Sequence, residues 1–216
     1  MTDSNRRNTI LIVEDDPDTA QLLVLQLERY GHAFEVASNG QEAILRTGEI
    51  PPDLVIMDVM MPRLDGFETT RFLKAKFRDA FLPILVLTAK DDAQSRSRGV
   101  RFGCDDYLTK PYDRDEMRAS VDALLALGHA ENAAIASHAA VAATALVEGE
   151  GAQEQVAAAA AAASTADDSV VEHRLGVATL LLDAGRGEHA KGHLERVLEL
   201  RSGHAQATEL LAQVGD

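Results

Sequence analysis

Short runs of β-branched and aliphatic residues alternate with longer amphipathic stretches through the first 128 residues of the chain. The short runs are apolar at almost every position, which is typical of strands that are covered on both faces of a parallel sheet. The amphipathic stretches repeat their apolar positions with the spacing of a helix. The strand-like runs lie at 10–13, 34–37, 54–57, 84–87 and 107–108, and the helical patterns lie near 17–30, 40–48, 66–77, 92–101 and 113–127.

This alternation predicts parallel βαβ units, and therefore a doubly wound α/β domain, for residues 8–128. The strand pattern stops after Leu127, and alanine becomes frequent, with an unbroken run at Ala157–Ala163. Alanine favours helix strongly but buries little surface, so an alanine-rich helix packs weakly. Residues 129–216 are therefore predicted to form an Ala-rich, all-α domain, with a loosely helical linker as the alternative for their first part.

A weak internal repeat divides this second region. Residues 143–148 resemble residues 178–183, which lie 35 positions further on, and each copy precedes a glycine-containing turn and a second helical stretch. The repeat predicts a degenerate unit at 134–168, a clearer one at 171–203 and a terminal helix at 204–214. A plain helical linker followed by a C-terminal hairpin is the alternative.

The charge of the chain limits its partners. The formal net charge is −14, which disfavours nonspecific binding to nucleic acids or anionic membranes. Residues 129–216 hold 13 acidic and only 5 basic side chains, unlike a DNA-reading domain. The single Cys104 permits no internal disulfide, and no apolar run reaches the length of a membrane-spanning helix. We expect a soluble, cytoplasmic protein that binds neither nucleic acid nor membrane.

Three consecutive acids follow the first apolar run, in the stretch TILIVEDDPD. Like charges repel, and solvent screens them poorly at the end of a buried strand, so a compensating interaction is expected. One candidate is a helix cap, with Asp16 as the N-cap, Pro17 at the first helical position and Asp18 in the first turn. The other candidate is a cation bound by the carboxylates.

Polar residues also follow the later apolar runs. Asp58 follows the third run, Thr88 the fourth and Lys110 the fifth. Because the carboxyl ends of parallel strands meet at one edge of a sheet, we expect these side chains to lie with Asp15 and Asp16 at that edge. One such residue is ordinarily a cap or turn residue, but five at equivalent positions predict a functional site.

The order of these residues, with MMPRLDG close behind Asp58 and a proline after Lys110, resembles the receiver domain of bacterial two-component response regulators. The resemblance covers residues 8–128 and implies a flavodoxin-like parallel sheet with the strand order 2-1-3-4-5. It implies that Asp58 accepts a phosphoryl group from a histidine kinase or a phosphotransfer protein. It implies no enzyme activity beyond self-catalysed phosphotransfer and autodephosphorylation.

The resemblance also implies a Mg²⁺ cofactor. The ion would be held by Asp15, Asp16, Asp58 and the backbone carbonyl of Met60, since Mg²⁺ prefers oxygen ligands and retains several waters. An ion at this place would offset the crowding of the acids.

A conformational switch is implied as well. Lys110 would place its ammonium group against a phosphoryl oxygen, and Thr88 would donate its hydroxyl to the same group. The ring of Tyr107 would then occupy the space that Thr88 leaves. From the residues alone, Lys110 could equally form an ion pair with Asp58, while Thr88 and Tyr107 could be ordinary strand residues.

One position departs from a common receiver pattern. Receivers of winged-helix transcription factors usually carry, in the last helix, an arginine that pairs across a dimer, and Ser120 stands at that position. The resemblance therefore leaves a phosphorylation-dependent dimer open.

The stretch LGVATLLLDAGRGEHAKGHLERVLEL resembles a tetratricopeptide repeat. Small and large residues stand at the interlocking positions of a helix pair, namely Ala178, Leu181, Gly185, Ala190, Leu194 and Val197. The usual aromatic positions of the first helix are missing, and Ser202 stands where proline is common. The resemblance implies that the second region signals by binding an unknown downstream protein, not DNA.

Three other functions remain open. A phosphatase of the haloacid dehalogenase type also uses Mg²⁺ and an aspartyl nucleophile, but would carry a D-x-D-x-T run after the first strand, where this chain has EDDPDT. A receiver-type scaffold could dock a partner without phosphorylation of Asp58. A phosphotransfer histidine at His189 would need one more residue before its Lys-Gly pair, and the register of His189 and His193 predicts exposure to solvent.

Overall fold

The computed structural model describes residues 7–89, 102–144 and 152–214, and the chain divides into two compact units. The first unit comprises residues 1–78 and 82–125, and the second comprises 79–81 and 126–216. The helix predicted at 92–101 lies outside the described residues.

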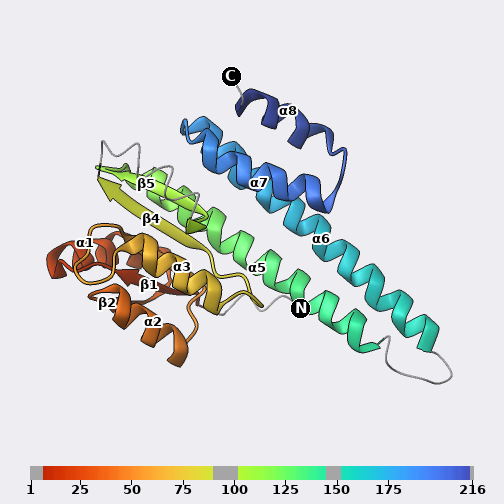
Figure 1. The fold of residues 1–216 in the computed structure, drawn as a ribbon, viewed down its shortest axis with the longest axis horizontal. Helices are drawn as coiled ribbons and strands as arrows, with labels where there is room; N and C mark the ends of the chain where they lie inside the picture. The colour runs from red at the N-terminus through yellow and green to blue at the C-terminus, as the bar shows by residue number, and fades with distance from the viewer. Residues whose placement is uncertain (1–6, 90–101, 145–151, 215–216) are drawn as a thin grey trace. The chain divides into compact units, whose positions relative to one another are not determined.

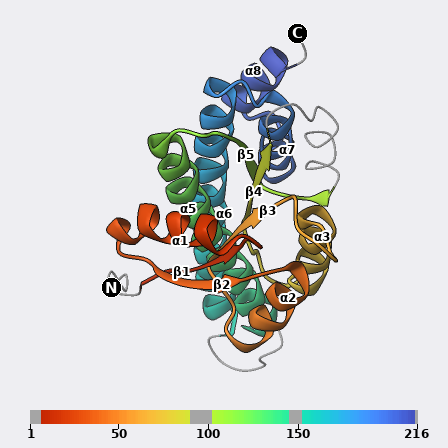
Figure 2. The same cartoon turned by 90° about the vertical axis from the view of Figure 1, so that its left-hand side faces the viewer.

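The first unit is built on a parallel sheet of five strands in the order β2-β1-β3-β4-β5 (Figures 1 and 2). This order confirms the predicted doubly wound, flavodoxin-like sheet. Each strand lies within one or two residues of its predicted position at both ends, except that β5 is longer than the two residues expected. The strands are β1 (Thr9–Val13), β2 (Ala33–Ala37), β3 (Leu54–Asp58), β4 (Ile84–Ala89) and β5 (Asp106–Lys110).

Alternate residues of the central strands enter two separate apolar cores, one on each face of the sheet. In β1, Leu11 and Val13 pack into the first core, while Ile10 and Ile12 pack into the second. This two-sided burial explains why the strand runs lack polar positions. The first core is closed by α2 (Gly40–Glu49) and α3 (Gly66–Lys76), and the second by α1 (Pro17–Leu27) and the first part of α5 (Arg114–Thr144).

The connections after the strands are fixed by side-chain caps. Asp16 is the N-cap of α1 and accepts a hydrogen bond from the Asp18 N–H at 3.1 Å, with Pro17 at the start of the helix. The predicted cap is therefore confirmed. A short 3-10 turn at Glu28–Tyr30 completes the helical stretch expected up to residue 30. Near the start of β5, Cys104 is only 8% exposed and belongs to the first core.

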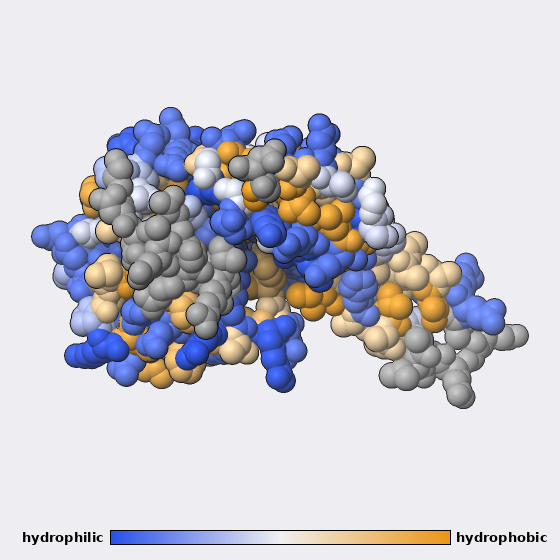
Figure 3. Space-filling model, turned by 45° about the horizontal axis from the view of Figure 1, so that its top comes forward, coloured by the Kyte–Doolittle hydropathy of each residue, from blue (hydrophilic) through white to orange (hydrophobic). Residues whose placement is uncertain are grey.

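The secondary structure of the second unit, in the part of the chain that the structure describes, consists of helices joined by short turns. It contains the rest of α5, followed by α6 (Ala152–Asp183), α7 (Gly187–Leu200) and α8 (Ala205–Val214). The helix α6 continues through residues 168–171, where two separate repeats would need a turn. Neither glycine nor proline occurs at 152–175, so nothing in the sequence interrupts that helix. Figure 3 shows pale orange, apolar surface toward the right of the view, as the alanine content of the helices predicts.

The turn between α6 and α7 falls where the clearer repeat predicted it, with Gly185 in the left-handed region at φ +72°. The apolar side chains that suggested a helix pair are fully buried: Ala178, Leu181, Ala190, Leu194 and Val197. The predicted exposure of His189 and His193 is wrong, because these histidines are 4% and 5% exposed. Within the part of the chain that the structure describes, no helix could span a membrane.

Candidate functional site

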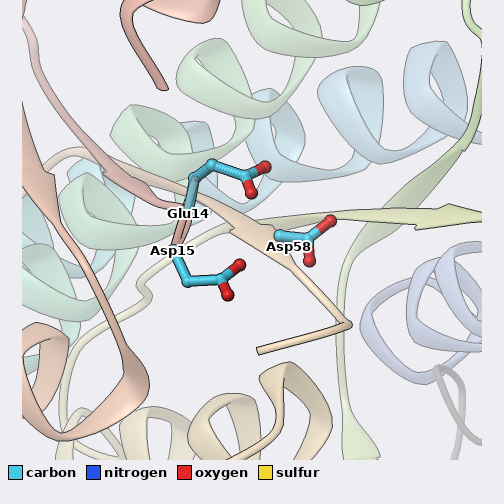
Figure 4. A group of neighbouring side chains, drawn as sticks. All are labelled: Glu14, Asp15 and Asp58. Carbon is cyan, nitrogen blue, oxygen red and sulfur yellow. The ribbon is translucent and has the colours of Figure 1, made fainter. Parts of the chain in front are cut away.

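Three carboxylates gather beyond the carboxyl ends of two neighbouring strands. Glu14 and Asp15 directly follow β1, and Asp58 is the last residue of β3. One oxygen from each of the three lies within 4.8 Å of the others, and Figure 4 shows the side chains next to one another. Glu14 and Asp58 are 5% and 6% exposed, while Asp15 is exposed. This arrangement concentrates negative charge in a partly enclosed place.

Lys110 brings a positive charge to the cluster from the end of β5. Its Nζ lies 2.6 Å from Oδ1 of Asp58 and 3.1 Å from Oε2 of Glu14. The Lys110–Pro111 peptide bond is cis. The ion pair that the sequence allowed between Lys110 and Asp58 is therefore present, although Asp58 precedes Lys110 by 52 residues.

The charges in this cluster shift one another's protonation. Burial raises the pKa of Glu14, and the negative charge of Asp58 adds to the increase, while Lys110 opposes it. Burial alone would lower the pKa of Lys110, but its hydrogen bond to Asp58 and the charges of Asp58 and Glu14 outweigh burial and raise it. Lys110 therefore stays protonated at neutral pH. Three carboxylates facing one ammonium leave the cluster suited to a further cation.

The backbone around Asp58 is held by the loop that follows it. The Met60 N–H donates to Oδ2 of Asp58 at 2.7 Å, which fixes the second carboxylate oxygen. The Gly66 N–H donates to the carbonyl of Val59 at 3.1 Å. A Cβ atom at position 66 would stand 2.2 Å from the backbone oxygen of Asp58, so only glycine permits this approach.

Asp16 does not share in the carboxylate cluster. Its Oδ1 accepts from the Asp18 N–H at 3.1 Å, and its Oδ2 accepts from the Thr19 hydroxyl at 2.8 Å. The hydrogen bond from Thr19, followed by that from Asp18, lowers the pKa of Asp16. Both carboxylate oxygens are thus occupied by the cap of α1, and its assignment as a metal ligand stays a prediction.

Glu14 is the cluster member that the sequence reasoning missed. It stands directly after Val13, the last residue of β1, and its Oε1 accepts from the Asp16 N–H at 3.4 Å. Its position in the sequence could have identified it. The first two residues after a strand lie at the edge of the sheet, whereas the next residue already caps the following helix.

Thr88 lies at the same edge of the sheet. Asp58 pairs with Leu87, so Thr88 is one residue beyond that pair, and the next residue of β4 pairs with Lys110. The Thr88 side chain is 7% exposed, and its hydroxyl donates to the carbonyl of Ala89 at 3.5 Å, the weak limit of a hydrogen bond. Such a weakly held hydroxyl can turn toward another acceptor.

Tyr107 and Met60 differ from the acids in their surroundings. Tyr107 lies three residues before Lys110 in β5 and is 7% exposed, within the core on the α2 and α3 face. Met60 is 74% exposed, and its backbone N–H donates to the carboxylate of Asp58. The roles predicted for Tyr107 and for the Met60 carbonyl stay predictions.

The donor set fits a hard divalent cation. Carboxylate oxygens at this separation can reach one ion, and neither cysteine nor histidine stands among them. A cation so placed would touch an oxygen of Asp58. The site can therefore combine a reactive carboxylate, an ammonium group and a cation.

Comparison with known proteins gives the same picture for the first half of the chain. The sequence model of the response regulator receiver domain matches residues 10–122. The alkaline phosphatase synthesis transcriptional regulatory protein PhoP of Bacillus subtilis is 41% identical over 116 residues, which are 54% of this chain and 48% of PhoP. Protein PilH of Pseudomonas aeruginosa is 38% identical over 117 residues, which are 54% of this chain and 97% of PilH.

A solved structure agrees with these relatives. The chemotaxis protein CheY4 of Vibrio cholerae is 26% identical, with a TM-score of 0.52 over 55% of this chain and 99% of CheY4. The chain spans about half the length of PhoP and of the regulators RpaA and MprA, and nearly all of PilH. The matches with these proteins cover little more than half of this chain.

Proposed function

This chain belongs to the response regulator receiver domain family through residues 10–122, and on that premise we propose that it accepts a phosphoryl group on Asp58 from a histidine kinase or a phosphotransfer protein. The observation that carries the proposal is the placement of Asp58, whose Oδ1 lies 2.6 Å from the ammonium of Lys110 beside two further acids. An isolated carboxylate would not need such surroundings.

The transfer is a displacement at phosphorus. An oxygen of Asp58 forms a new P–O bond while the bond from phosphorus to the donor's imidazole nitrogen breaks, and the nitrogen keeps the electron pair. Lys110 orients Oδ1 and offsets the negative charge that the phosphoryl oxygens bring. The Met60 N–H holds Oδ2, so the two Asp58 oxygens are distinguished before a donor arrives.

Glu14, Asp15 and Asp58 would hold Mg²⁺, as receiver domains typically do at an acidic site. The ion, when bound, neutralises charge on the phosphoryl oxygens. Asp16 and the carbonyl of Met60 were further predicted ligands, and the cap contacts of Asp16 favour Glu14 in its place.

Thr88 and Tyr107 carry the proposed response to phosphorylation. The weakly held hydroxyl of Thr88 turns to donate to a phosphoryl oxygen, and the Tyr107 ring fills the volume that is vacated. Phosphorylation shifts the balance between two states, and it acts only through contacts that differ between them. The support for this step is the burial of both side chains on adjacent strands.

The second unit is proposed to act on a downstream protein and not on DNA. Its 13 acids against 5 bases in residues 129–216 disfavour contact with phosphate backbones. PhoP is named a transcriptional regulator, but the match to it ends within about the first half of this chain. The DNA-binding activity of such relatives is therefore not carried over.

The test is labelling of the full chain with acetyl phosphate. We expect stable incorporation in the presence of Mg²⁺, loss of incorporation with EDTA, and loss in Asp58→Asn. Asp18→Asn, which alters an exposed acid outside the cluster, is the matched control and should be labelled like the unchanged protein. Equal labelling of Asp58→Asn, or sustained hydrolysis of a phosphomonoester, would contradict the proposal.

A further inference from the structure

A buried ion pair joins three helices of the second unit. Arg174 of α6 is 9% exposed, and its Nε and Nη2 both contact Oε1 of Glu131 in α5, which is 8% exposed. The Nη1 of Arg174 lies 3.3 Å from Nδ1 of His193 in α7. Burying two opposite charges costs solvation energy that their attraction only partly returns, so such a pair is weak evidence for stability alone.

The same arginine contacts a segment that is distant in the chain. Residues 79–81 belong to the second unit, and the guanidinium of Arg174 lies 5.4 Å from the centroid of the Phe81 ring. A guanidinium over an aromatic face is attracted by the ring's quadrupole, more strongly where water is excluded. Arg174 therefore links the helix pair to the Phe81 side chain.

Asn132 binds the backbone of the same residue. Its Oδ1 accepts from the Phe81 N–H at 2.8 Å, and its Nδ2 donates to the Phe81 carbonyl at 2.8 Å and to the Gly128 carbonyl at 2.9 Å. One amide side chain thus satisfies both backbone polar groups of Phe81, as a neighbouring strand would. The backbone of Phe81 is thus held by Asn132 of α5, and its ring is contacted by Arg174 of α6.

The position of Phe81 in the chain connects these contacts to the strand β4. Phe81 stands three residues before Ile84, where β4 begins, and the same strand carries Thr88 near its other end. Hydrogen bonds of 2.8 Å weaken steeply when their geometry is disturbed. A small shift of β4 along its own axis would therefore weaken the hydrogen bonds between Phe81 and Asn132.

We propose that Asn132 and Arg174 form a regulatory clamp on residues 79–81, through which the phosphorylation state of Asp58 reaches the helical unit. The proposal rests on the proposed function of Asp58. Phosphorylation moves Thr88, the displacement passes along β4 to Phe81, and the paired hydrogen bonds to Asn132 open or tighten. By the reciprocity of linked equilibria, loosening the clamp also changes the phosphorylation of Asp58.

The experiment is amide hydrogen exchange of the full chain, with and without acetyl phosphate and Mg²⁺, followed at residues 79–83. In Asn132→Ala we expect the Phe81 amide to exchange roughly fivefold to tenfold faster, because its acceptor is removed. Ser137→Ala, five residues further along the same helix, is the control and should leave exchange at Phe81 unchanged. Asn132 is exposed, so its replacement should leave the helical circular dichroism unchanged.

The coupling is read from the phosphorylated protein. Labelling of the unchanged chain should alter exchange at residues 79–83 by about threefold or more, and Asp58→Asn should show no response. Asn132→Ala should also change the labelling rate, which a purely structural role would not do. Normal exchange in Asn132→Ala, or unaltered exchange in a chain that is demonstrably labelled, overturns the clamp. Failure of the unchanged chain to be labelled at all overturns the proposed function, and the clamp with it.

Discussion

Replacing Gly66 with alanine should slow the phosphorylation of Asp58 much more than it lowers the stability of the fold. The new Cβ would stand 2.2 Å from the backbone oxygen of Asp58 and 3.0 Å from Cγ of Met57. Relief requires a displacement of about 1 Å of backbone that is buried in the sheet, because carbon–oxygen contact needs well over 3 Å. Overpacking of this kind costs about 1–3 kcal/mol of unfolding free energy.

The larger effect should fall on phosphorylation. A displacement of about 1 Å at a reacting group can lower a rate roughly 100-fold, so acetyl phosphate labelling should slow by about that factor. The measurement compares labelling rates under conditions in which urea titration shows both proteins to be folded. Gly176→Ala is the matched control, since no atom lies within 4 Å of a Cβ at that helical position. It should stabilise the chain by about 0.5–1 kcal/mol and label normally.

Labelling of Gly66→Ala at the normal rate would refute the argument that Gly66 holds the Asp58 backbone in place. A slower rate that merely follows the fraction of unfolded protein would refute it equally. Either result would mean that the loop after β3 relaxes without disturbing the phosphoacceptor.

Further predictions concern the charges. Glu14→Gln should weaken Mg²⁺ binding by about tenfold or more, measured by calorimetry. Asp16→Asn should cost about 1 kcal/mol of unfolding free energy and leave the Mg²⁺ affinity nearly unchanged. A larger loss of Mg²⁺ affinity in Asp16→Asn than in Glu14→Gln would restore Asp16 as the ligand. Lys110→Ala should tighten Mg²⁺ binding about tenfold, because a competing cation is removed, while slowing labelling; weaker binding would contradict this. Hydrogen bonds from the Ser38 backbone and hydroxyl, and then from Arg46, lower the pKa of Glu42 from 4.5 to about 2. A lowered pKa stabilises the folded state above pH 4.5, and this contribution fades as the pH falls toward 2. Glu42→Gln should therefore cost about 1 kcal/mol at pH 7, after allowance for solvent screening, and almost nothing near pH 2 in urea titrations; a pH-independent cost would refute the assignment.

The strands and most of the site were predictable because their causes are local. A strand buried on both faces has no polar positions, so its limits are visible in the sequence, and the carboxyl ends of parallel strands must meet. That reasoning placed Asp58, Lys110 and Thr88 at one edge. The structure confirms the ion pair between Asp58 and Lys110 at 2.6 Å.

The choice between Glu14 and Asp16 could not be made in this way. A helix cap and a cation both favour a short acid just after a strand, so the sequence satisfies either interpretation at Asp16. The choice depends on where α1 begins, since Thr19 and the Asp18 N–H bind both oxygens of Asp16. The pair that clusters with Asp58, Glu14 and Asp15, therefore lies one residue before the predicted pair, Asp15 and Asp16.

The histidines of α7 were misjudged for a different reason. Their expected exposure came from the pattern of one helix, whereas His193 packs against Arg174, a partner from α6. A polar residue on a helix is buried when another helix supplies a matching polar group, and sequence periodicity does not report such distant pairs. The contact between Asn132 and Phe81, 51 residues apart, escaped prediction for the same reason.

The single thiol of the chain makes Cys104 a natural reporter. It is 8% exposed, and burial raises the pKa of its thiol, so the reactive thiolate is scarce while the first unit stays closed. Alkylation by a soluble reagent therefore requires transient opening of the chain just before β5. The fraction of Cys104 that iodoacetamide alkylates in a brief exposure would therefore report how often the chain opens there, without an engineered label.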